Sequence, residues 1–269
     1  MSYNSESTFN KENLDLYLKA LGKEFRRLNG KATPADIILI GGAAVLANYG
    51  FRDMTADIDA IVRASSAMKD AIRSVRDRYN LPNGWLNSDF EHTASYTPKL
   101  LQYAGYYRTF SNVLTVRTIS AEYLIAMKLR SGRQYKNDLS DVLGILNEHA
   151  QRGTPIALEQ IKVAVRNLYG AWEALPEHSI RLIESACASG RYGELYAATR
   201  QGEQAALETL VQFEQNNPGQ LNEERIDAVL DDATDPPRES VREVLRRLRA
   251  EREKANPTTD EPNHQQRKR

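Results

Sequence analysis

Two aspartates separated by one residue, Asp57 and Asp59, have the spacing in this sequence that points most directly to chemistry. Their segment, Asp-Ile-Asp-Ala-Ile-Val, begins by alternating carboxylate and apolar residues and predicts a strand over 57–62. Residues two apart on a strand face the same side, so both carboxylates would point one way. Like charges this close repel each other, and a hard divalent cation bound by oxygen ligands removes that cost.

A glycine pair, Gly41-Gly42, lies between an apolar strand predicted over 37–40 and a helix predicted over 43–48. Backbone N–H groups at such a strand-to-helix turn are free to cradle a phosphate. Asp-X-Asp on an exposed strand and Gly-Gly in a turn are each common as purely structural features. Their combination on adjacent elements is more specific and indicates phosphoryl or nucleotidyl transfer, in which metal ions clamp the attacking and leaving oxygens.

A second group comprises Lys128, Arg130, Arg133, Lys136, Asp138 and Asp141. Lys128 lies near the end of a helix predicted over 121–130, and the two acids lie at the start of a helix predicted over 136–149. The two acids are three residues apart and share a helix face. They could stabilise the helix dipole. Alternatively, the lysine contacts phosphates while a carboxylate orients it or acts as a base.

The remaining pattern predicts an α+β (mixed α/β) fold, with a small mixed sheet flanked by helices and an all-helical C-terminal module. We expect a first domain over 1–150, a helical domain over 154–254 and a disordered tail over 255–269. Further helices are predicted at 11–29, 66–78, 157–170, 178–188, 192–215, 222–231 and 238–254, and a strand at 113–119. Ser66 and Ser120 are expected to act as helix caps, and 81–110 to be irregular.

Composition excludes several classes of protein. Lys and Arg together number 36 and so do Asp and Glu, so a globally basic nucleic-acid coat is excluded. The single cysteine, Cys187, excludes an internal disulfide and a cysteine-rich zinc site. No apolar run is long enough to cross a bilayer, and there is no signal pattern, P-loop or Gly-x-Ser-x-Gly motif. We expect a soluble cytoplasmic protein with no membrane partner.

The first motif resembles that of the polymerase-beta-like nucleotidyltransferases: an apolar strand, Gly-Gly, a spacer, then acid–apolar–acid. The residues that carry this resemblance are Gly41, Gly42, Arg52, Thr55, Asp57, Ile58 and Asp59. Together with AEYLIAMKLRSGRQYKNDLSDV over 121–142, the pattern is similar to the branch that contains AbiEii- and MenT-type toxins.

The resemblance implies Mg²⁺ (or Mn²⁺) held by Asp57 and Asp59, with an NMP unit transferred from a nucleoside triphosphate to an acceptor. It implies that Asp138 or Asp141 provides the later acid of the family. The nucleotide-binding residues that it implies are Gly41, Gly42, Arg52, Thr55 and Lys128. In toxin members the acceptor is the 3′ end of tRNA, which predicts a toxin–antitoxin or phage-defence role and an antitoxin partner.

Several alternatives stay open. The strand over 113–119 carries no acid, so Asp89 and Glu91 are the candidates for a third carboxylate. Tyrosines and cations over 96–110 suit either nucleic-acid contact or packing. The alternative function is a weakened nucleotidyltransferase-fold binding module that docks a protein partner, with the Arg-rich segment 238–254 as its contact helix. A related phosphotransfer activity such as AMPylation of a protein is a further alternative.

Overall fold

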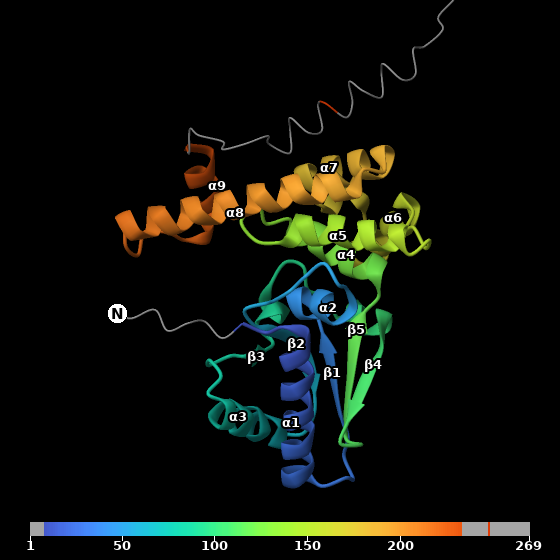
Figure 1. Cartoon of the computed structure of the whole chain (residues 1–269), viewed down its shortest axis with the longest axis vertical. Helices are drawn as coiled ribbons and strands as arrows, with labels where there is room; N and C mark the ends of the chain where they lie inside the picture. Colours follow the sequence, from blue (N-terminus) through green and yellow to red (C-terminus); the bar gives the residue numbers. More distant parts are fainter. Residues whose placement is uncertain (1–7, 233–246, 248–269) are drawn as a thin grey trace, which may run out of the picture.

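The centre of the molecule is a five-stranded mixed sheet in the order β3-β2-β1-β5-β4 (Figure 1). The computed structural model of the chain describes residues 8–232 and Arg247. β1 pairs antiparallel with β2 and parallel with β5, while β3 joins β2 in parallel and β4 joins β5 antiparallel. The strands are β1 Ala35–Leu39, β2 Ile58–Arg63, β3 Leu86–Asn87, β4 Ala104–Phe110 and β5 Leu114–Ile119. This sheet confirms the predicted α+β class.

Helices lie along the sheet and beyond one of its ends. In Figure 1, α1 runs along the sheet, while α4 to α8 gather beyond the end at which α2 begins. The α-helices are α1 Lys11–Asn29, α2 Gly41–Asn48, α3 Ala67–Tyr79, α4 Ala121–Ser131, α5 Asp138–Gln151, α6 Leu158–Tyr169, α7 Glu177–Ser189, α8 Tyr192–Asn216 and α9 Glu223–Asp232. Short 3₁₀ segments are η1 Asp89–His92, η2 Pro98–Tyr103 and η3 Trp172–Ala174. No helix in the described part of the chain has the length and apolar character needed to cross a bilayer.

Most element predictions are confirmed, but the irregular segment predicted over 81–110 is wrong. It contains β3, two 3₁₀ segments and β4. β4 is an edge strand with a register irregularity between Tyr106 and Arg108, so its side chains do not alternate cleanly between buried and exposed. Ser66 and Ser120 do precede helices, but neither side chain makes a capping hydrogen bond. The predictions for 238–254 and 255–269 lie outside the described residues, apart from Arg247, which contacts Glu194.

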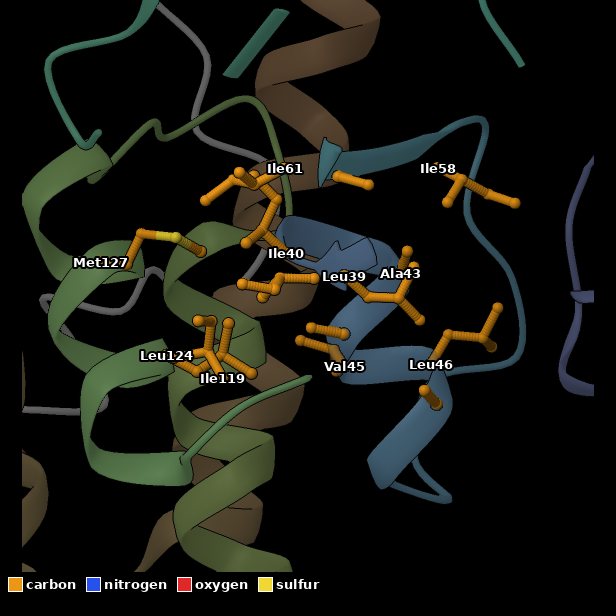
Figure 2. Packing of buried hydrophobic residues seen from close by; sticks show 14 of the residues in the cluster. Leu39, Ile40, Ala43, Val45, Leu46, Ile58, Ile61, Ile119, Leu124 and Met127 are labelled. Atoms are coloured by element: carbon orange, nitrogen blue, oxygen red, sulfur yellow. The ribbon is translucent and has the colours of Figure 1, made fainter. Parts of the chain in front are cut away.

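The hydrophobic core closes over the junction between the sheet and the helices (Figure 2). Side chains from the end of β1, from the start of β2, from the end of β5, from α2 and from α4 meet there and are fully or almost fully buried. They include Leu39, Ile40, Val45, Leu46, Ile58, Ile119, Leu124 and Met127. Burying this apolar surface fixes the start of α2 against β2 and fixes α4 beside both.

The helical C-terminal region is tied to α5 by Glu203 of α8. Its buried carboxylate accepts hydrogen bonds from the backbone N–H of Leu139 (2.9 Å) and Ser140 (3.3 Å), and from the Ser140 hydroxyl (2.5 Å). These N–H groups belong to the first turn of α5 and have no partner within that helix. A side chain distant in sequence thus caps the helix that carries Asp138 and Asp141.

Replacing Glu203 by Gln should remove a pH dependence of stability. Burial raises the pKa of Glu203 from 4.5 to about 8, against the hydrogen bonds from Ser140 and Leu139. A carboxyl group whose pKa is raised by folding stabilises the folded state below its ordinary pKa, and this contribution is lost as pH rises through the folded value. The free energy of unfolding of the wild type, relative to Glu203→Gln, should therefore fall from pH 4.5 to about 8.

Urea unfolding of both proteins across this pH range measures the difference. The Gln amide can keep the same partners, because its oxygen accepts from the N–H groups and its NH₂ donates to the serine hydroxyl. Parallel stability profiles for the two proteins would contradict the prediction.

Candidate functional site

The antiparallel pairing of β1 with β2 brings the two sequence motifs together. Leu39 at the end of β1 pairs with Ala60, and the Ile40 N–H donates to the Asp59 carbonyl at 3.0 Å. The start of β2 therefore lies beside the turn at which β1 passes into α2. Ile58 is fully buried, whereas Asp59 is half-buried and Asp57, in the bend before the strand, is exposed.

A cavity of about 260 Å³ opens at this junction and is lined by residues from four parts of the chain. The residues singled out from the sequence that it brings together are Gly41, Asp57, Asp59, Asp89, Lys128, Arg133, Lys136 and Asp138. Its other lining residues are Phe90, Thr93, Ser95, Met127 and Ser131. The cavity thus combines carboxylates, cations, hydroxyls and an aromatic ring.

The two glycines face different neighbours. Gly41 has φ +56°, in the left-handed region, and a Cβ there would lie 3.0 Å from Asp59 Oδ2. A Cβ on Gly42 would lie 2.5 Å from Thr55 Oγ1 and 2.9 Å from Arg52 Nη2. Gly41 therefore allows the carboxylate to approach the start of α2, while Gly42 allows the loop before β2 to pack against that helix.

Gly42, Arg52 and Thr55 lie together, but none of them is among the described residues that line the cavity. Thr55 is buried and exchanges two backbone hydrogen bonds of 2.8 Å with Phe9. Arg52 Nη1 lies 2.5 Å from Asp141 Oδ2. In this structure these residues hold the loop between α2 and β2, and their assignment to nucleotide binding stays a prediction.

A buried charge network forms one wall of the cavity. Lys128 Nζ lies 2.9 Å from both Asp138 Oδ1 and Asp141 Oδ2, and Arg133 Nε lies 2.8 Å from Asp138 Oδ2. Burial alone would lower the pKa of Lys128, but the two aspartates outweigh burial and raise it. Burial alone would raise the pKa of Asp138, but Lys128 and Arg133 hold it well below its usual range. Asp138 is therefore an ionised partner that orients Lys128 and Arg133, and its assignment as the later acid of the family stays a prediction.

The Asp57–Asp59 pair has a different electrostatic environment. Burial, and then the neighbouring Asp57 carboxylate, raise the pKa of Asp59 to about 6, against the opposing effects of Lys128, Lys136 and Arg133. Across the described residues, no group of three or more His, Cys, Asp or Glu side chains is arranged to hold a metal ion. Mg²⁺ in nucleotide sites is usually held by one or two carboxylates together with water and substrate phosphates, so this pair fits that ion.

A further acid, beside Asp57, Asp59 and Asp138, enters the cavity from a segment that was predicted to be irregular. Asp89 lines the cavity, whereas Glu91 is not among its lining residues. The reason is β3, which pairs Asn87 with Asp59 in parallel and so places η1 next to the start of β2. A two-residue strand has no detectable periodicity, so sequence analysis could propose Asp89 but could not place it.

The comparison with protein-family models gives independent information on the part of the chain that forms the cavity. Residues 17–148 match the model of a family described as a nucleotidyltransferase of unknown function (DUF6036). Every residue that lines the cavity falls within this nucleotidyltransferase-like segment. The match supports transferase activity at a coarse level, and the AbiEii/MenT branch stays a prediction. The comparisons with curated proteins and with solved structures gave no match.

Substituting Gly42 by Ala should disturb the loop that leads to Asp57. The added Cβ would meet Thr55 Oγ1 at 2.5 Å, and overpacking of this kind costs about 1–3 kcal/mol of stability. Thermal or urea unfolding measures this loss. Gly50→Ala is the matched control, because a Cβ at Gly50 meets nothing within 4 Å.

If the contact with Thr55 causes the loss, Thr55→Ala should partly relieve it. The double variant should then be less destabilised than the sum of the single variants. Strict additivity would show that the Gly42–Thr55 contact is not the cause.

Removing the charge of Lys128 should destabilise the fold. Lys128→Met leaves Asp138 and Asp141 buried with one cation fewer, and breaking a buried ion pair costs about 3–5 kcal/mol. Adding Asp138→Asn should recover part of this loss in urea unfolding. Lys69→Met, at an exposed position of α3, is the control and should change stability by less than about 0.5 kcal/mol. An equally small effect at Lys128 would contradict a structural role for the network.

Proposed function

We propose that this protein is a magnesium-dependent nucleotidyltransferase that moves an NMP unit from a nucleoside triphosphate to an acceptor hydroxyl. The observation that carries the proposal is the cavity at the start of α2, which brings Asp57 and Asp59 together with the cations Lys128, Arg133 and Lys136. The family match over the same residues supports transferase chemistry there.

In this proposal each part of the cavity has a distinct task. The start of α2 offers backbone N–H groups to a phosphate. Lys128, Arg133 and Lys136 offset the charge of the triphosphate. Asp57 and Asp59 hold Mg²⁺ (or Mn²⁺), which when bound polarises the reacting phosphate and favours the ionised form of the attacking hydroxyl.

The reaction replaces one phosphoanhydride bond with one phosphate ester bond. The acceptor oxygen forms a bond to the α-phosphorus, the bond between this phosphorus and the bridging oxygen to the β-phosphate breaks, and pyrophosphate leaves. The hydroxyl proton passes to a carboxylate. Asp89 is our candidate for this step, because Asp138 is already paired with Lys128 and Arg133.

The acceptor in the proposal is an alcohol, either at the 3′ end of a tRNA or on a protein side chain. The tRNA acceptor follows from the resemblance to toxin nucleotidyltransferases, which also suggests a toxin–antitoxin or phage-defence role with an antitoxin partner. An assay that offers both acceptors separates these alternatives.

A second candidate function is a nucleotidyltransferase-fold binding module with a weakened site. The lack of a three-acid metal cluster within the described residues favours it. In that case the helices after α5 would dock a protein partner, and the protein would transfer no nucleotide.

Asp57→Asn and Asp59→Asn should each lower transfer on the order of 10³-fold, because a metal ion contributes several kcal/mol to transition-state stabilisation. The assay incubates purified protein with each α-labelled nucleoside triphosphate, Mg²⁺, total tRNA and cell protein. Asp53→Asn, an exposed position in the same loop, is the matched control and should retain activity. Circular dichroism should show that all three variants are folded.

Label on tRNA that is lost in both site variants would support a tRNA-directed enzyme, and label on protein would change the acceptor. The absence of label and of Mg²⁺-dependent nucleotide binding in the wild type would favour the binding module. Equal transfer by Asp57→Asn, Asp59→Asn and the wild type would refute the assigned site.

A further inference from the structure

The cavity has two chemically different walls. One carries charge of both signs, from the acids Asp57, Asp59 and Asp138 and from the cations Lys128, Arg133 and Lys136. The other is formed by residues 89–95 and carries, beside Asp89, an aromatic ring and two hydroxyl groups, from Phe90, Thr93 and Ser95. A ligand that fits both walls has a charged end, such as a phosphate chain with its divalent cation, and a flat, weakly polar end.

The second wall is held in place by α4 and α6. Tyr169 of α6 donates its hydroxyl to the Ser95 carbonyl at 2.7 Å. The Arg130 guanidinium of α4 lies 5.8 Å from the centre of the Tyr169 ring and 3.5 Å from the Ala94 carbonyl. Within the wall, the Thr93 hydroxyl donates to the Phe90 carbonyl at 2.9 Å. These contacts fix the backbone of the wall before any ligand binds, which lowers the entropic cost of binding.

Phe90 supplies the aromatic surface of this wall. Among the described residues that line the cavity, it contributes the sole aromatic ring. The ring is half-buried and packs edge-to-face against Tyr96, with centroids 5.9 Å apart and an interplanar angle of 88°. This neighbour fixes the orientation of the ring without stacking on its face, and part of the ring faces the cavity.

We propose that Phe90 is the stacking platform for the nucleobase of the bound nucleoside triphosphate, with Thr93 and Ser95 at its edge. The triphosphate then lies at the charged wall, beside Asp57 and Asp59 and within reach of the cations. This inference rests on the proposed function and adds to it the orientation of the nucleotide. Stacking on an aromatic ring accepts any base, because each base has a π-face.

The test compares nucleotides with a ligand that has phosphates but no base. Dissociation constants are measured for ATP, GTP, CTP and UTP, and for inorganic tripolyphosphate, all with Mg²⁺. Phe90→Ala should weaken binding of the nucleotides that the wild type binds by about 5- to 150-fold and leave tripolyphosphate binding unchanged. Phe90→Tyr keeps a ring and should bind like the wild type.

Two further variants control for poor folding of Phe90→Ala and for the loss of an aromatic ring elsewhere. Phe90→Leu retains an apolar contact for Tyr96 without the ring, and should show the same selective loss if Phe90→Ala folds poorly. Tyr106→Ala removes an aromatic ring from an exposed position on β4 and should leave every affinity unchanged.

Equal weakening of nucleotide and tripolyphosphate binding would overturn the stacking role, because it would indicate loss of the whole cavity. Unchanged nucleotide binding in Phe90→Ala would also overturn it, while leaving the proposed function intact. If the wild type binds none of the nucleotides, whether or not it binds tripolyphosphate, both the inference and the proposed function fail.

Discussion

The arrangement of the site depends on one buried ammonium group, that of Lys128 between Asp138 and Asp141. Its side chain is 7% exposed, and removing such a charge from water costs several kcal/mol unless close partners compensate. The two aspartates lie on α5, and they also bind Arg133 and Arg52. The need to compensate the buried charge of Lys128 therefore fixes α4, α5 and the loop before β2 relative to one another. Two cations of the cavity wall, Lys128 and Arg133, are oriented by their structural partners before any ligand arrives.

The loop between α2 and β2 connects the buried charge network to the carboxylate pair. Phe51 lies against α5 so closely that a Cβ on Gly144 would come 2.5 Å from its ring. The Tyr196 ring of α8 packs edge-on against Phe51 at 5.6 Å. Both Tyr196 and Glu203 lie outside the segment that matches the family model. The helices that follow this segment thus help to position the loop that leads to Asp57, which gives them a role in the geometry of the site beyond covering the sheet.

A site residue could be predicted from the sequence where the interactions that position it are local along the chain. It could not be predicted where its position depends on contacts between distant segments. Asp57, Asp59 and Gly41 could be found because their motif is local and an antiparallel strand pair suffices to join it. Motif spacing indicates that Gly42, Arg52 and Thr55 are near one another, but it does not tell on which side of α2 they lie. Phe90 was missed as a site residue because its place depends on a two-residue strand, and Glu203 because its partners are more than sixty residues away in the chain. β4 was missed because its bulge breaks the alternation that marks a strand.

The distribution of charge explains why the carboxylate pair, and not the later acids, is suited to a cation. Asp138 and Asp141 already have cationic partners at hydrogen-bond distance. Within the part of the chain that the structure describes, neither Asp57 nor Asp59 forms an ion pair. The pKa of Asp59 is raised because burial and the Asp57 carboxylate outweigh the effect of the more distant cations. Had Lys128 paired with Asp59, the fold would have neutralised the position at which a divalent cation and a triphosphate could meet. Because Asp138 and Asp141 of α5 bind Lys128 of α4 instead, the carboxylates at the start of β2 keep their negative charge in a cavity that cations also line.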